Sequence, residues 1–209
     1  ATGDYSTLSG GSGNVASGEH SFIGGGEGNE AKTNYSTIAG GDRNRIYSFD
    51  PANNPNCVIG GGVSNVIGNT TSGQVSDSFI GGGDNNKIGE VDGESALGAV
   101  IGGGTYNKIK GNDSSRSVIG GGYDNEITGH HCTVSGGSGN VASGGFNGGH
   151  VVIGGGSGNH ALDEYSTIAG GFSNQATAEY SFVGGGEQNY ATQLYSTITG
   201  GKWNKIYGF

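Results

Sequence analysis

Apolar residues recur at two fixed positions around an asparagine along this chain. The first apolar position lies six residues before the asparagine, and the second lies two residues after it. Between them stands a glycine pair, whose second member always precedes the asparagine by three residues. The pattern occurs twelve times, and neither apolar position has an exception. Such regularity predicts a structural repeat and not a disordered glycine-rich linker.

Aligning the repeats defines three columns of equivalent residues. The asparagine column is Asn14, Asn29, Asn44, Asn65, Asn86, Asn107, Asn125, Asn140, Asn159, Asn174, Asn189 and Asn204. The first apolar column is Leu8, Ile23, Ile38, Ile59, Ile80, Ile101, Ile119, Val134, Ile153, Ile168, Val183 and Ile198. The second is Ala16, Ala31, Ile46, Ile67, Ile88, Ile109, Ile127, Ala142, Ala161, Ala176, Ala191 and Ile206. The interval between successive asparagines varies, from Asn14–Asn29 among the shortest to Asn44–Asn65 among the longest, so a constant module is followed by a connection of variable length.

The spacing within each module is that of β-strands. A serine stands two residues before the first apolar residue, as Ser21 does before Ile23, and such neighbours face the same side of a strand. Several glycines per module would each destabilise a helix by about 1 kcal/mol. The predicted fold class is therefore all-β, a narrow parallel β-solenoid of about twelve coils with 15–21 residues per coil. With about 4.8 Å between coils, the rod would be roughly 58 Å long.

One domain is expected over residues 1–209, and the variation in length is expected in lateral loops. The insertions fall at 45–57, 66–78, 87–99, 108–117 and 143–150. The first four follow one another, so we expect them to leave the rod at the same corner and to stack into a flap. Loops on rigid scaffolds often carry function, so these loops are candidates for ligand binding or for lateral contact between copies.

The glycine and asparagine columns are interpreted as structural. Glycine is expected where the coil turns tightly or where a neighbouring backbone leaves no room for a Cβ atom. Asparagine adopts left-handed conformations readily, and its amide can bond turn backbone or the asparagine of the next coil. Stacked identical residues form hydrogen-bond ladders, and we prefer this reading to twelve separate ligand sites.

An aromatic ring precedes the serine in several repeats. These residues are Tyr5, His20, Tyr35, Tyr165, Tyr180 and Tyr195. They should face outward if the serine faces inward. A stacked ladder would stabilise neighbouring coils, and the same stripe could also bind a sugar or pack against another subunit.

The motif S-x-I-x-G-G-x-x-N-x-A, as in Ser181–Ala191, resembles the head repeats of YadA-like trimeric autotransporter adhesins. Glycine-rich β-solenoid repeats of phage tail-fibre-type proteins are similar. The resemblance covers nearly the whole chain. It implies left-handed parallel β-rolls, three chains around one axis, and a role in surface adhesion.

Composition and charge argue against a collagen-like fold, nucleic-acid binding and a membrane span. Glycine makes up 49 of the 209 residues, but with only two prolines and no three-residue period the chain is not collagen-like. The net charge of −9 is scattered and includes no basic stripe, so nucleic acid is not an expected partner. No stretch approaches the roughly 20 apolar residues of a membrane span.

Candidate chemistry is sparse, and we expect neither an enzyme nor a cofactor. The run GGSGNVA resembles calcium-binding repeats, but its period is wrong and asparagine replaces the acid. Loop acids that could form weak calcium sites are Asp77, Asp84, Glu90, Asp92 and Glu94. The adjacent pair His130–His131 is expected in a surface loop. Cys57 and Cys132 both occupy the serine column about 19 Å apart, so we expect two buried thiols without a mutual disulfide.

Function is expected to follow from the ends of the solenoid. The first and last coils keep the repeat pattern, and in a head-to-tail stack the interval from Asn204 to the next Asn14 would fall inside the range of intervals observed within the chain. The leading hypothesis is an extracellular structural protein that stacks into a filament. The alternative is a trimeric adhesin or phage tail-fibre segment at the cell surface that binds glycans. Ice binding would need flat threonine arrays, and Thr follows the serine only at 7, 37, 167 and 197.

Overall fold

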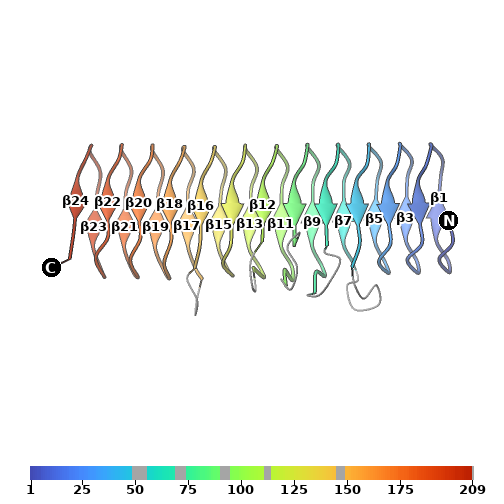
Figure 1. Ribbon diagram of the computed structural model, residues 1–209, viewed down its shortest axis with the longest axis horizontal. Coiled ribbons are helices and arrows are strands. Elements are labelled where there is room, and N and C mark those ends of the chain that lie inside the picture. The colour runs from blue at the N-terminus through green and yellow to red at the C-terminus, as the bar shows by residue number, and fades with distance from the viewer. Residues whose placement is uncertain (49–55, 69–73, 90–94, 111–113, 145–148, 209) are drawn as a thin grey trace.

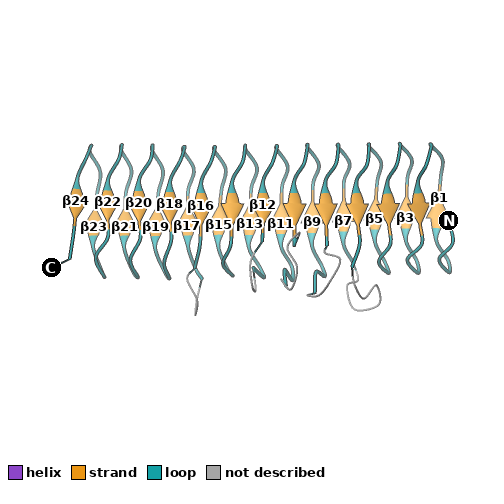
Figure 2. Ribbon diagram, in the orientation of Figure 1, coloured by secondary structure: helices purple, strands orange, loops and turns teal. Residues whose placement is uncertain are grey.

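The computed structural model shows an all-β rod of twelve coils, which confirms the predicted β-solenoid (Figures 1 and 2). It describes residues 1–48, 56–68, 74–89, 95–110, 114–144 and 149–208. Each coil adds one strand to each of two parallel sheets of twelve strands. The first coil lies at one end of the rod and the twelfth at the other (Figure 1).

Every strand is two residues long, and the two sheets alternate along the chain. The odd-numbered sheet contains β1 (Thr7–Leu8), β3 (Phe22–Ile23), β5 (Thr37–Ile38), β7 (Val58–Ile59), β9 (Phe79–Ile80), β11 (Val100–Ile101), β13 (Val118–Ile119), β15 (Thr133–Val134), β17 (Val152–Ile153), β19 (Thr167–Ile168), β21 (Phe182–Val183) and β23 (Thr197–Ile198). The even-numbered sheet contains β2 (Val15–Ala16), β4 (Glu30–Ala31), β6 (Arg45–Ile46), β8 (Val66–Ile67), β10 (Lys87–Ile88), β12 (Lys108–Ile109), β14 (Glu126–Ile127), β16 (Val141–Ala142), β18 (His160–Ala161), β20 (Gln175–Ala176), β22 (Tyr190–Ala191) and β24 (Lys205–Ile206).

The register between coils never slips, although the connections differ in length. Ile23 pairs with Ile38 across one of the short connections, and Ile59 pairs with Ile80 across one of the long ones. A third ladder of single parallel bridges, from Ser12–Glu27 to Glu187–Lys202, runs beside the two sheets. The additional residues of the long coils therefore do not disturb the pairing of the module.

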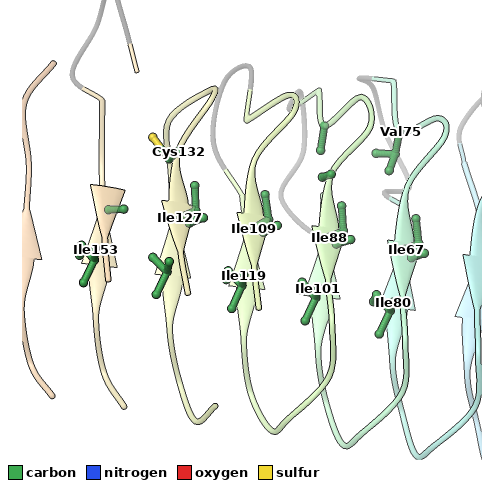
Figure 3. Packing of buried hydrophobic residues seen from close by; sticks show 14 of the residues in the cluster. Ile67, Val75, Ile80, Ile88, Ile101, Ile109, Ile119, Ile127, Cys132 and Ile153 are labelled. Carbon is green, nitrogen blue, oxygen red and sulfur yellow. The ribbon is translucent and has the colours of Figure 1, made fainter. Parts of the chain in front are cut away.

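The core is one thin column of side chains between the two sheets. The inward residue of every inner strand has 0% exposure, from Ala16 and Ile23 onward to Ala191. Figure 3 shows Ile67 and Ile80, and then Ile88 and Ile101, repeating from coil to coil. Leu8 and Ile206, in the first and last coils, are only partly buried. The serine column also faces this interior, as Ser36 and Ser166 do with 0% exposure.

The second glycine of each pair sets how closely the coils stack. Gly137, for example, has a φ of +92°, a conformation that side chains other than glycine rarely adopt. A Cβ atom at Gly137 would overlap the carbonyl oxygen of Gly156, the equivalent glycine of the next coil. The same overlap recurs at this position through the inner coils, so both the turn and the coil spacing require glycine here.

The predicted flap lies partly outside the described residues, because 49–55, 69–73, 90–94 and 111–113 are not among them, and neither are residues 145–148 of the fifth insertion. The residues that flank these segments do lie at one corner of the coil. Near the ends of two successive insertions, Nδ2 of Asn56 donates to Oδ1 of Asp77 at 3.1 Å. The insertions at 45–57 and 66–78 therefore return to the rod at equivalent positions.

We predict that Gly137→Ala destabilises the rod by about 3 kcal/mol or more, because it combines a strained φ with an overlap against backbone. The matched control is Gly139→Asn. Gly139 has a φ of +63° and no atom within 4 Å of its Cβ position, and Asn85 holds the equivalent place with a φ of 54°. Denaturant unfolding should separate the two variants clearly. Equal unfolding midpoints would contradict the role assigned to Gly137.

Candidate functional site

The asparagine column forms a continuous hydrogen-bond ladder through the rod. The backbone N–H and the Nδ2 of Asn86 donate to Oδ1 of Asn65 at 3.0 and 3.1 Å. The same Nδ2 lies 3.0 Å from the carbonyl oxygen of Gly82 and 2.8 Å from that of Gly104. Each amide thus ties together three successive coils, and its polar atoms are used within the protein.

The burial of the asparagines also indicates that this column has a structural role. All ten asparagines between the end coils have 0% exposure. A ligand therefore has no access to them. The predicted column lies where the sequence pattern places it, and its geometry is that of a scaffold.

We predict that Asn107→Ala in the middle of the rod lowers the free energy of unfolding by roughly 2–4 kcal/mol, because buried glycine carbonyls lose their donor. Asn14→Ala removes the equivalent residue of the first coil, where the amide is partly exposed, and should cost about 1 kcal/mol. Chemical unfolding followed by circular dichroism measures both. A larger loss at Asn14 would contradict the ladder as the source of the effect.

The residues nine positions before each asparagine form a second column, here named the corner column. All twelve have positive φ, and the eleven that are not glycine have values from 51° to 62°. The sequence pattern identified Tyr5, His20, Tyr35, Tyr165, Tyr180 and Tyr195. It missed His131 and His150, which counting back nine residues from Asn140 and Asn159 would have found.

The rings of the corner column stack face to face in two runs. The first run joins Tyr5, His20 and Tyr35 with centroids 4.8 and 5.0 Å apart. The second run is His131, His150, Tyr165, Tyr180 and Tyr195, with centroids 4.9 to 5.2 Å apart. Between them stand Asn56, Asp77, Gly98 and Arg116.

This stacking limits what the corner column can bind. In Tyr165–Tyr180 and Tyr180–Tyr195 the planes differ by only 2° and 12°, so each inner ring covers the faces of its neighbours. These inner rings expose their edges, and not their faces, to solvent. A sugar that stacks on an aromatic face therefore has no place within a run, and the geometry favours packing between coils.

The outer surfaces of the two sheets differ in charge. The outward residues of the odd-numbered strands are Thr7, Phe22, Thr37, Val58, Phe79, Val100, Val118, Thr133, Val152, Thr167, Phe182 and Thr197. None of them is ionisable. The outward residues of the even-numbered strands are Val15, Glu30, Arg45, Val66, Lys87, Lys108, Glu126, Val141, His160, Gln175, Tyr190 and Lys205. The rod therefore has one uncharged face and one mixed charged face.

Cys57 and Cys132 lie in the serine column, and neither forms a disulfide. Both side chains are buried, with 0% exposure. Burial is the main cause that raises the pKa of each thiol to about 11. The thiol of Cys57 donates to the carbonyl oxygen of Val75 at 3.2 Å, and that of Cys132 to His130 at 3.3 Å.

We predict that both thiols react slowly with a thiol-specific disulfide reagent at pH 8 while the protein is folded. The thiolate is the reactive form, and a pKa near 11 makes it scarce at that pH, while burial blocks the reagent. The reaction should accelerate as pH rises toward 11 and on unfolding at pH 8. Two thiols titrated within seconds in the native state would be inconsistent with this burial.

In the part of the chain that the structure describes, no group of three or more His, Cys, Asp or Glu side chains is arranged to hold a metal ion. Of the five loop acids considered as calcium ligands, Asp77 and Asp84 belong to the described residues, whereas Glu90, Asp92 and Glu94 lie outside them. The described residues also include no helix of the length and apolarity that crossing a bilayer requires.

The chain matches no protein-family model, and no curated protein matches its sequence. The fold and the chemistry of its surfaces are therefore the basis for a functional proposal.

Proposed function

We propose that this chain is an extracellular structural protein whose solenoid rods stack head to tail into a filament. The observation that carries the proposal is that the end coils keep the register of the inner coils. Strands β1 and β2 end the two sheets at the first coil, where the Thr2 N–H donates to the carbonyl oxygen of Ala16 at 2.8 Å, and β23 and β24 end them at the last coil. Any two successive coils in the rod show how such edges join.

The bonds available at such a joint can be read from the interior. Tyr190 N–H donates to the carbonyl oxygen of Asn204 in the next coil at 2.8 Å. By the same repeat, the Lys205 N–H would donate to the carbonyl oxygen of Asn14 in the following copy. The Oδ1 of Asn204 would accept from the backbone N–H and the Nδ2 of that Asn14, as the Oδ1 of Asn189 accepts from Asn204. Open strand edges of this kind recruit further strands.

The charges at the two ends of the rod also favour head-to-tail stacking. Residues 1–31 contain Asp4, Glu19, Glu27 and Glu30 and no lysine or arginine. Residues 195–209 contain Lys202 and Lys205 and no acidic residue. Opposite charge would bring the last coil of one copy toward the first coils of another and would oppose the reverse pairing.

We predict long thin filaments in negative-stain images of the purified protein, and a ladder of masses by mass photometry. Lys205→Pro should shorten or abolish them, because it removes the N–H that would donate to Asn14 of the following copy. Lys205→Ala loses the same charge and keeps the N–H, so it serves as the control. A parent protein with one monomeric mass at every concentration would refute the filament.

A second candidate is a closed trimer of the adhesin or phage-fibre kind that binds surface glycans. The uncharged face of the odd-numbered sheet favours it, because a stripe of Thr, Val and Phe along the whole rod suits packing against neighbouring rods. Phe22, Phe79 and Phe182 on this face are 36 to 40% exposed. The same mass measurement separates the two candidates, since a trimer has one mass of three chains and a filament has many.

A further inference from the structure

The corner column lacks a side chain at Gly98, in the middle of the rod. Gly98 occupies the column position with a φ of +65°, and no heavy atom lies within 4 Å of where its Cβ would be. A pocket of about 200 Å³ lies beside the next column residue, Arg116, and is lined by Leu97, Ser115, Arg116, His130 and His131.

The polar groups around this pocket include several hydrogen-bond donors. Arg116 Nη1 lies 3.3 Å from His131 Nε2, and the guanidinium can only donate. The Oγ of Ser115 accepts from the Leu97 N–H at 3.3 Å, which leaves the hydroxyl proton to donate. The ring of His130 stacks on that of His131 with centroids 5.1 Å apart.

Arg116 differs from most other cations of the rod in its surroundings. Lys32, Arg43, Lys108, Lys110 and Lys202 each lie within 4.0 Å of a carboxylate. Within the described ranges, Arg116 has no carboxylate at that distance. Its side-chain partner is an imidazole, so the guanidinium retains donors for an anion although the chain as a whole is acidic.

We propose that this pocket binds an oxyanion, such as the carboxylate or sulfate group of an acidic sugar. The planar guanidinium of Arg116 matches two oxygens of such a group, and Ser115 and the imidazole of His130 supply further donors. Leu97 gives the pocket an apolar wall against which a sugar ring can lie. The site is independent of whether the rods stack end to end.

The charged and titratable groups that face the pocket are Arg116, His130 and His131, with His150 stacked behind His131 at 4.9 Å. None of the side chains that line the pocket is acidic, so an oxyanion would offset the positive charge of Arg116.

The test is titration of the intact chain with sodium sulfate and, separately, with glucuronate, followed by NMR of the histidine ring protons. We expect saturable shifts for His130 and His131. His20 and His160 lie on other coils and are internal references that should not follow the same curve.

Two variants make the test specific, with folding checked by circular dichroism. Arg116→Gln should weaken binding about tenfold or more. Gly98→Asn should place a side chain beside the pocket and weaken anion binding as well. Asparagine fits the backbone at this position, because Asn56 occupies the same column with a φ of 62°. Arg43→Gln, on another part of the rod, is the matched control and should bind like the parent.

The ligands distinguish the source of the anion. Glucuronate binding more tightly than sulfate would identify a sugar-borne carboxylate, and the reverse would identify a free inorganic anion; either supports the site. Non-saturating shifts shared by all histidines, or equal affinity in Arg116→Gln and the parent, would overturn it.

Discussion

The ladder of asparagine amides and glycine carbonyls is the interaction on which the rest of this structure depends. It holds each coil directly over the next, because one amide bonds the preceding asparagine, a glycine of its own coil and a glycine of the following coil. The glycine at each step must lack a Cβ atom, or its neighbour's carbonyl would have no room. These two requirements explain why asparagine and glycine recur while most other residues vary.

Constant register has consequences at every other position of the coil. A residue in one column always has the equivalent residues above and below it, so side chains act as columns and not as isolated groups. In the interior this produces a core of Ile, Val and Ala that is only one side chain wide. At the corner it brings rings such as Tyr165 and Tyr180 into contact. On the outer faces it produces one uncharged and one charged surface.

The proposals for function use the same columns in different ways. Continuity of the ladder at β1 and β24 supports end-to-end stacking, whereas the uncharged face supports packing side by side. The pocket beside Arg116 lies one coil from Gly98, which interrupts the corner column. A periodic scaffold therefore acquires individual sites where a column is broken, and regular assembly surfaces where it is not.

The repeat, the strand spacing and the inward columns could be predicted from the sequence, because period and residue type encode them within a single module. Ile101 and Asn107 were placed correctly from their spacing alone. The single-bridge ladder that includes Glu27 and the positive φ of the corner column could not be predicted, since neither has an apolar period.

Only the tertiary structure shows that Nη1 of Arg116 reaches Nε2 of His131 and that Leu97 and Ser115 line the pocket beside them. Counting back from Asn125 and Asn140 places Arg116 and His131 in neighbouring coils, but it does not give the direction of their side chains. Closure of each coil over the one before it decides which side-chain atoms meet.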